Sequence, residues 1–121
     1  VTVELLALAK TRAVVAGHLM LRHNQSEALL DLTQKLGANC ASTFSCKDGN
    51  LEGSEQAAGI YCGAMSTDFL AKVIEGEDST HVTLAVGMTN NEFDTGVFTG
   101  KLNQHNLVQV FSEHVVINGE Q

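Results

Sequence analysis

The sequence lacks proline and tryptophan, and it has one tyrosine and three cysteines among its 121 residues. It has no uncharged apolar run near the ~20 residues that a membrane-spanning helix needs, so we expect no transmembrane helix. Basic residues are few, since seven Lys and Arg stand against fourteen Asp and Glu. They are also scattered, whereas binding to phosphates requires clustered cations. We therefore expect neither nucleic acid nor a membrane as a partner.

What the sequence does contain is enough apolar residues for a folded core. Hydrophobic residues make up 44% of the chain and charged residues 17%, which excludes a disordered tail. The sequence has no Gly-X-Y period, which excludes collagen. A length of 121 residues is typical of one domain, so we predict that residues 1–121 form a single domain.

The first part of the chain is predicted to be helical. Residues 5–22 are rich in Leu and Ala, which favour helix, although a pair of strands over 1–7 and 13–21 is the alternative. Asn24 and Glu27 have the spacing of a capping box for a second helix over 25–36. Gly37 would end that helix.

The middle of the chain combines strand and helix signals. Residues 39–46 are small and β-branched in alternation, which predicts a strand, and Asp48-Gly49 predicts a tight turn. A long helix is predicted over 54–75, ended by Gly76.

The last third is predicted to be rich in strands, because Val, Thr and aromatic residues recur between turn signals. The predicted strands cover 81–86, 95–102 and 107–117. The predicted fold class is therefore α+β, with an antiparallel sheet of about four to five strands packed against two or three helices.

The chain ends suggest an unusual connection. Asn118-Gly119 is a hairpin turn that follows one arm and lacks the second, and Val1–Leu5 would suit the missing arm. Met65-Ser66 is similar to a natural chain start. Either the two termini are neighbours in one sheet, or the chain order is rearranged from that of a parent protein.

The three cysteines, Cys40, Cys46 and Cys62, are odd in number and lack a zinc-binding spacing. The preferred interpretation is a cytoplasmic protein with three unbonded thiols. Export stays open because the chain begins with Val1 instead of Met. In that case a Cys46–Cys62 disulfide could close a loop.

Few residues suggest chemistry. Asp48–Gly53 matches the first half of a calcium loop, but the position that needs a bidentate Glu is Gly59, so an exposed acidic turn is expected. Phosphate-binding glycine loops and a nucleophile elbow are absent. We predict no catalytic, cofactor-binding or metal-binding residues and no cofactor. The five histidines are expected at the surface, namely His18, His23, His81, His105 and His114.

The order of predicted elements over 25–117 resembles the roadblock (dynein light chain) family. The matching features are Leu29–Leu32 before the first strand, Asp48-Gly49 at the turn, and the Ala-rich helix from Gln56. The resemblance implies a small module that dimerises and regulates or scaffolds GTPases and motors.

Two functions follow from these features. The first is a non-enzymatic interaction or scaffold module that binds itself and another protein, because the apolar segment 5–22 suits a subunit interface. The alternative is a secreted or surface adhesin or pilus-type subunit with the Cys46–Cys62 disulfide. A small enzyme of unrecognised type is the third possibility.

Overall fold

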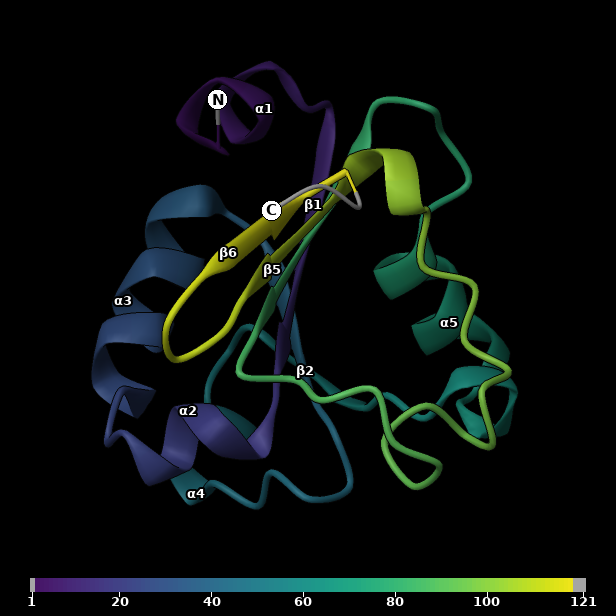
Figure 1. Ribbon diagram of the computed structural model, residues 1–121. Helices are drawn as coiled ribbons and strands as arrows, with labels where there is room; N and C mark the ends of the chain where they lie inside the picture. The colour runs from purple at the N-terminus through teal and green to yellow at the C-terminus, as the bar shows by residue number, and fades with distance from the viewer. Residues whose placement is uncertain (1, 119–121) are drawn as a thin grey trace.

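The structure, a computed structural model, describes residues 2–118, and within them the chain forms one six-stranded sheet flanked by helices (Figure 1). The strands lie in the order β3-β2-β1-β4-β5-β6, and every neighbouring pair is parallel except β5 with β6. The strands are β1 (Thr11–Ala16), β2 (Asn39–Ser42), β3 (Ala57–Ile60), β4 (His81–Val86), β5 (Leu107–Val110) and β6 (Val115–Ile117).

Helices cover both faces of this sheet. Buried side chains of α1 to α4 pack on one face, whereas Leu70 and Ile74 of α5 pack on the other. Figure 1 shows this division, with α2 and α3 on one side of the strands and α5 on the other. The α-helices are α1 (Thr2–Leu8), α2 (His18–Arg22), α3 (Ser26–Leu36), α4 (Gly49–Glu52) and α5 (Asp68–Glu75), and short 3-10 turns occur at Gly63–Met65 and Gln104–Asn106.

The predicted mixture of helix and strand is confirmed, but the predicted antiparallel sheet of four to five strands is wrong. Parallel neighbours require a crossover between them, usually a helix. Helices α2 and α3 lie between β1 and β2 in the chain, and α5 lies between β3 and β4. The helices therefore serve as crossovers, which the antiparallel prediction did not require.

The predicted helix over 5–22 is wrong because its middle is the central strand β1. Residues 13–16 are at most 1% exposed, since helices cover both faces of β1. A strand buried on both faces carries a continuous apolar run, so its sequence is hard to distinguish from that of a buried helix. The alternative pair of strands is right in part, since residues 13–16 lie in β1, but its first strand is wrong because Thr2–Leu8 is helical.

The predictions for 25–36 and 81–86 are confirmed as α3 and β4. Gly37 ends α3 in the left-handed conformation, with φ 60°. The capping box is wrong, because Gln25 occupies the N-cap without a side-chain hydrogen bond and Asn24 has φ 54°.

The middle segments are shorter than predicted. Strand β2 covers the first half of 39–46, and the long helix over 54–75 divides into strand β3 and helix α5. Pairing of β3 with β2 overrides the helix preference of its alanines. Asp48 is buried instead of lying in an exposed turn, and its Oδ1 accepts a hydrogen bond from Asn50 N at 2.9 Å at the start of α4.

Two of the strands predicted for the last third differ from the structure. The predicted strand over 95–102 is wrong, since these residues belong to a loop that joins β4 to β5 without a crossover helix. The predicted strand over 107–117 is interrupted by the turn of the β5–β6 hairpin.

The predicted half-hairpin at Asn118-Gly119 extends outside the described residues. Of its expected second arm, Val1–Leu5, the described residues 2–5 are helical and belong to α1. Met65-Ser66 lies in the connection between β3 and α5. A rearranged chain order stays an untested alternative.

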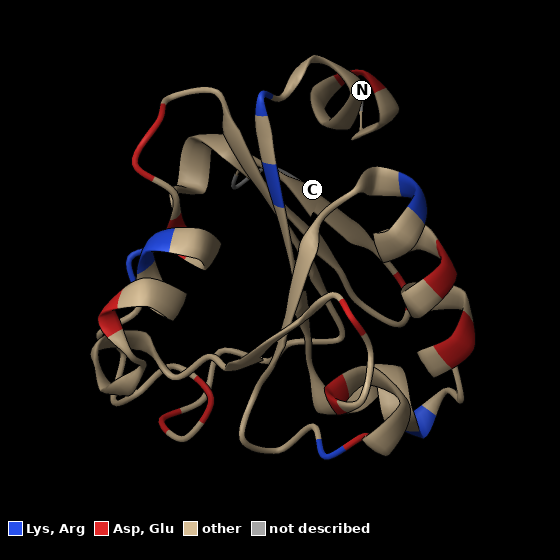
Figure 2. Ribbon diagram, turned by 180° about the vertical axis from the view of Figure 1, so that it is seen from behind, with Lys and Arg blue, Asp and Glu red and all other residues tan. Residues whose placement is uncertain are grey.

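The predictions about partners and compartment stay predictions. Figure 2 shows Lys and Arg on separate elements, including β1 and α5, with Asp and Glu interspersed. Within residues 2–118, no helix has the length and apolar character that crossing a bilayer requires.

Candidate functional site

The carboxyl ends of the parallel strands surround a hollow of about 820 Å³, which we call the edge hollow. In open α/β sheets, ligands bind outside the carboxyl ends of the strands, where the strand order reverses. Here the chain runs from β1 outward to β3 and returns to β4 on the other side of β1, so β1 and β4 flank that point. The segments after β1, β2, β3 and β4 line the hollow with His18, Phe44, Ser45, Cys62, Met65, Asn91, Glu92, Phe93 and Val97.

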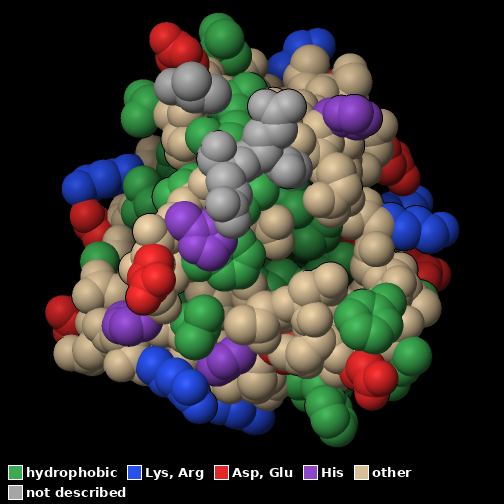
Figure 3. All heavy atoms as spheres, in the orientation of Figure 1, with side chains coloured by type: hydrophobic (Ala, Val, Ile, Leu, Met, Phe, Trp, Pro, Cys, Tyr) green, Lys and Arg blue, Asp and Glu red, His purple; other side chains and the backbone are tan. Residues whose placement is uncertain are grey.

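Large apolar side chains form the walls of the edge hollow. Phe44 is 51% exposed, Met65 69%, Phe93 80% and Val97 67%. Figure 3 shows hydrophobic side chains gathered at the lower right, over the loops that follow β3 and β4. Apolar side chains that gather on a surface in this way mark a site of interaction or ligand binding.

The loop that carries Phe93 and Val97 is held in a strained conformation. Val97 and Phe98 both have φ 59°, a left-handed value that is rare for bulky and β-branched residues. Val97 N donates to Glu92 O at 2.8 Å, and Phe98 N donates to Thr95 Oγ1 at 3.0 Å. Such strain costs about 1–3 kcal/mol per residue and concentrates at functional sites.

Asp94 anchors the polar side of the edge hollow. Its side chain is 0% exposed, and it accepts hydrogen bonds from Ser45 N at 3.0 Å, Ser45 Oγ at 2.5 Å and Asn91 Nδ2 at 2.9 Å. His18 Nδ1 lies 3.9 Å from Asp94 Oδ2 and 3.4 Å from Ser45 Oγ. One buried carboxylate therefore joins the loops that follow β1, β2 and β4.

The hydrogen bonds of Asp94 decide its charge. Burial by itself raises the pKa of Asp94, but the hydrogen bonds from Ser45 and Asn91 outweigh burial and leave the pKa below its usual value. Asp94 is thus ionised at neutral pH and gives His18 an anionic neighbour.

The cysteines are free thiols, as the preferred interpretation expected, and the Cys46–Cys62 disulfide of the export alternative does not form. Cys62 lines the edge hollow, and its Sγ donates a hydrogen bond to Phe93 O at 3.1 Å. Cys46 instead belongs to the core beneath α1 to α4. Burial raises the pKa of Cys40 to about 11 and that of Cys46 to about 12, so both thiols stay protonated at neutral pH.

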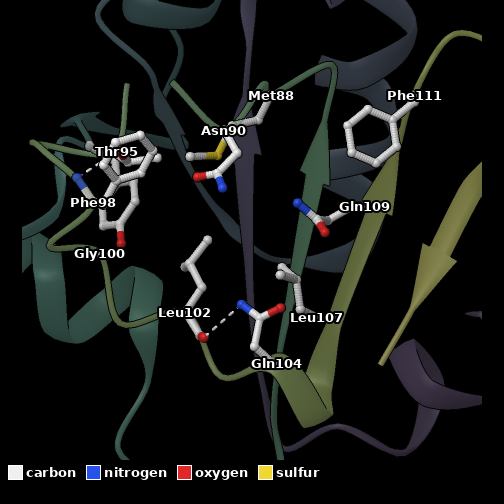
Figure 4. A pocket seen from close by; sticks show the side chains of 11 residues that line it. Met88, Asn90, Thr95, Phe98, Gly100, Leu102, Gln104, Leu107, Gln109 and Phe111 are labelled. Carbon is white, nitrogen blue, oxygen red and sulfur yellow. Dashed lines mark hydrogen bonds between the residues drawn. The ribbon is translucent and has the colours of Figure 1, made fainter. Parts of the chain in front are cut away.

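A second pocket, of about 370 Å³, lies beside β5, where the β4–β5 loop replaces a crossover helix. Figure 4 shows the side chains of Asn90 and Gln109 there, from the loop and from β5. Tyr61 also lines this pocket, and its hydroxyl donates to Glu75 Oε1 at 2.8 Å. Burial and that hydrogen bond raise the pKa of Tyr61. Among the described residues that line this pocket, none is Asp, Glu, Lys, Arg or His.

His81 is the histidine for which the predicted surface position is wrong, at 4% exposed. Its Nε2 lies 3.0 Å from Ile74 O, and its Nδ1 lies 2.9 Å from Thr11 Oγ1. It therefore joins α5 to the start of the sheet. The remaining histidines are at least partly exposed, namely His18, His23, His105 and His114.

The crevice between β1 and β4 is closed by backbone contact. A Cβ on Gly17 would lie 2.2 Å from Gly87 O, and a Cβ on Gly87 would lie 2.4 Å from Met20 N. Leu19 N already donates to Gly87 O and Met20 N to Gly17 O, both at 3.1 Å. Amides that would hold a diphosphate at this point of the fold are therefore used inside the protein.

Comparison with known families adds the decisive observation. The model of the thiamine pyrophosphate enzyme central domain matches residues 1–121. The chain belongs to this family. It is also similar to pyruvate decarboxylase isozyme 2 of Saccharomyces cerevisiae, with 29% identity over 118 residues. That match covers 95% of this chain and 20% of the yeast protein, so the chain spans about a fifth of the length of this relative.

Membership in the thiamine pyrophosphate enzyme family overturns the predicted resemblance and function. The resemblance to the roadblock family is wrong, because it rested on an order of elements with a long helix over 54–75 and a strand over 95–102, and the chain forms neither. The prediction of a non-enzymatic scaffold or GTPase regulator is wrong because the chain belongs to the thiamine pyrophosphate enzyme family. The adhesin alternative is also wrong, since it requires a Cys46–Cys62 disulfide and all three cysteines are free thiols.

Thiamine pyrophosphate does not fit the residues described here. Proteins hold a diphosphate with a divalent cation or with free amides at a helix start. Residues 2–118 contain no group of three or more His, Cys, Asp or Glu that could hold a metal ion. The amides of Gly17, Leu19 and Met20 at the start of α2 are already paired. We therefore assign no step of cofactor chemistry to these residues.

Sequence reasoning missed Ser45 and Asp94, which lie 49 positions apart in the chain. Neither belongs to a recognisable motif, and only the parallel sheet brings their loops together. The sequence contained one signal for this pair, because Asp94 is a carboxylate inside the apolar segment 93–98. A charge that is buried among apolar residues requires dedicated hydrogen-bond partners.

Proposed function

We propose that this chain works as the central domain of a thiamine pyrophosphate-dependent enzyme that decarboxylates a 2-oxo acid such as pyruvate. The family match over residues 1–121 carries the proposal, and the 29% identity to the yeast pyruvate decarboxylase supports it. In this reaction the C1–C2 bond of the 2-oxo acid breaks, CO2 leaves, and the remaining carbonyl carbon gains a proton to give an aldehyde. Thiamine pyrophosphate, held by another part of the enzyme, supplies the electron sink for that cleavage.

In such an enzyme we expect the described residues to bind another group and hold it in position, whereas the C1–C2 bond breaks in another part of the enzyme. Asp94 holds the loops after β1, β2 and β4 in one arrangement through Ser45, Asn91 and His18. This arrangement fixes the shape of the edge hollow before anything occupies it. A pre-formed site of this kind loses less free energy on binding than a mobile one.

The test is a decarboxylation assay on the full-length protein that contains this chain. With pyruvate, Mg²⁺ and thiamine pyrophosphate, we expect CO2 and acetaldehyde in equal amounts. Omission of thiamine pyrophosphate should abolish both products. A full-length protein that binds thiamine pyrophosphate but releases no CO2 from pyruvate or from longer 2-oxo acids would contradict the proposal.

A further inference from the structure

Phenylalanine lies at the surface of this protein more than in its core. Four of the five phenylalanines are more than half exposed, whereas Tyr61 is fully buried. Aromatic side chains stabilise a core when buried, and on a surface they are enriched at protein interfaces. Two of these four, Phe44 and Phe93, line the edge hollow, whereas Phe98 lines the pocket beside β5.

The loop that presents Phe93 is held by contacts with the rest of the chain. Its strained turn packs directly on the segment after β3, where Ala64 N donates to Thr99 Oγ1 at 2.9 Å. A Cβ on Gly63 would lie 2.3 Å from Thr95 O, so the two backbones are in contact. A rigid apolar surface loses little conformational entropy on binding, which favours one specific partner.

Charge indicates the chemistry of that partner. The whole chain carries a formal charge of −7, and Glu92 lines the edge hollow. Among the described residues that line it, none is Lys or Arg. A second copy of this chain would bring its own Glu92 to the same place, and like charges that face each other disfavour association. An apolar segment flanked by basic residues would match both the apolar walls of the edge hollow and the negative charge of Glu92.

We propose that the edge hollow is the docking site for an apolar segment with flanking Lys or Arg, and that this segment belongs to the cofactor-bearing part of the same polypeptide. The inference rests on the proposed function, which places thiamine pyrophosphate outside these residues. The matched region is 20% of the yeast relative, so an enzyme of that length has ample chain to supply the segment. A hollow of about 820 Å³ is large enough for several apolar side chains.

The first test is photo-cross-linking in the full-length enzyme, with p-benzoylphenylalanine replacing Phe93 in one variant and Phe69 in another. Phe69 is the matched control, because it is 73% exposed on α5 and does not line the edge hollow. We expect the probe at position 93 to link to a peptide outside residues 1–121 of the same polypeptide, with Lys or Arg beside apolar residues. The probe at position 69 should not give this link.

Two outcomes would overturn the inference. One is a link from position 93 to residues 1–121 of a second subunit, which identifies a second copy as the occupant. The other is a yield at position 93 no higher than at position 69, which identifies a surface open to solvent.

The second test is amide exchange over residues 91–99 in the full-length enzyme. Phe93→Ser should accelerate exchange by about tenfold, the effect of losing one interface anchor, whereas Phe69→Ser should leave it unchanged. Equal exchange in both variants contradicts docking. Neither measurement requires turnover, so a failure to decarboxylate pyruvate would count against the proposed function alone.

Discussion

The amino and carboxyl ends of the parallel strands differ in how their polar and apolar groups are placed. At the amino ends, Arg12 donates to the carbonyls of Leu6 and Ala7, and His81 contacts α5 and β1. At the carboxyl ends, large apolar side chains face solvent around the buried charge of Asp94. Natural proteins depart from stable local arrangements mainly at functional sites. The difference supports the proposal that the carboxyl edge binds another group, and it indicates that Arg12 and His81 at the amino edge contribute to the stability of the fold.

The largest effect is expected where the two carboxyl-edge turns touch. Gly17→Ala places a Cβ 2.2 Å from Gly87 O and 2.3 Å from Met88 Cα, which are backbone atoms that cannot move aside alone. We expect a loss of about 3 kcal/mol or more in the free energy of unfolding, measured by urea denaturation. The matched control is Gly49→Ala, because a Cβ there meets nothing within 4 Å. Equal stability of the two variants would show that the turns are not in contact.

Asp94→Asn tests the charge beneath the edge hollow. We expect a loss of about 2–3 kcal/mol at pH 7, because the hydrogen bonds to an ionised group are weakened. Folding lowers the pKa of Asp94, so its contribution is present above the pKa of the unfolded side chain and is lost as the pH falls through the lower folded value. The difference from wild type should therefore shrink below about pH 4.

The control for Asp94→Asn is Asp31→Asn. The Asp31 side chain is 62% exposed and pairs with Lys35 at 2.6 Å. We expect this exposed helix pair to change stability by less than about 0.5 kcal/mol. A loss for Asp94→Asn that is equally small, or that does not vary with pH, would argue against an ionised Asp94.

Arg12→Met tests the amino edge. The Arg12 guanidinium donates to the last carbonyls of α1 and lies 3.5 Å from Leu36 O at the end of α3. Its removal leaves those carbonyls without a donor, so we expect a loss of about 1–2 kcal/mol and faster amide exchange in α1. Arg22→Met, at an exposed position, serves as the control. Unchanged exchange in α1 would mean that its position depends on apolar packing alone.

The smallest effect is expected from a reductant. Because the three cysteines are free thiols, dithiothreitol should leave the free energy of unfolding unchanged, and the unfolded chain should titrate three thiols. Alkylation of the folded protein at pH 8 should be slow at Cys40 and Cys46, since burial raises their pKa to about 11 and about 12. If only one thiol titrates in the unfolded protein, two of the three cysteines form a disulfide and this prediction is wrong.

Local sequence signals were sufficient to predict elements that bury only one face. Helix α3 has an apolar stripe and a glycine at its end, and both features are visible in residues 26–37. They were insufficient for β1 and for the turn at Val97 and Phe98. Burial on two faces removes the alternation that identifies a strand, and left-handed φ values at bulky residues oppose local preference.

The apolar content of the sequence predicted a folded core, and local signals predicted the end of α3 at Gly37 and the strand β4 over 81–86. The same signals did not predict that the strands run parallel or that Ser45, Asp94 and His18 come together. Helix ends and apolar periodicity depend on neighbours a few residues away, whereas strand direction and a shared carboxylate depend on contacts between distant segments.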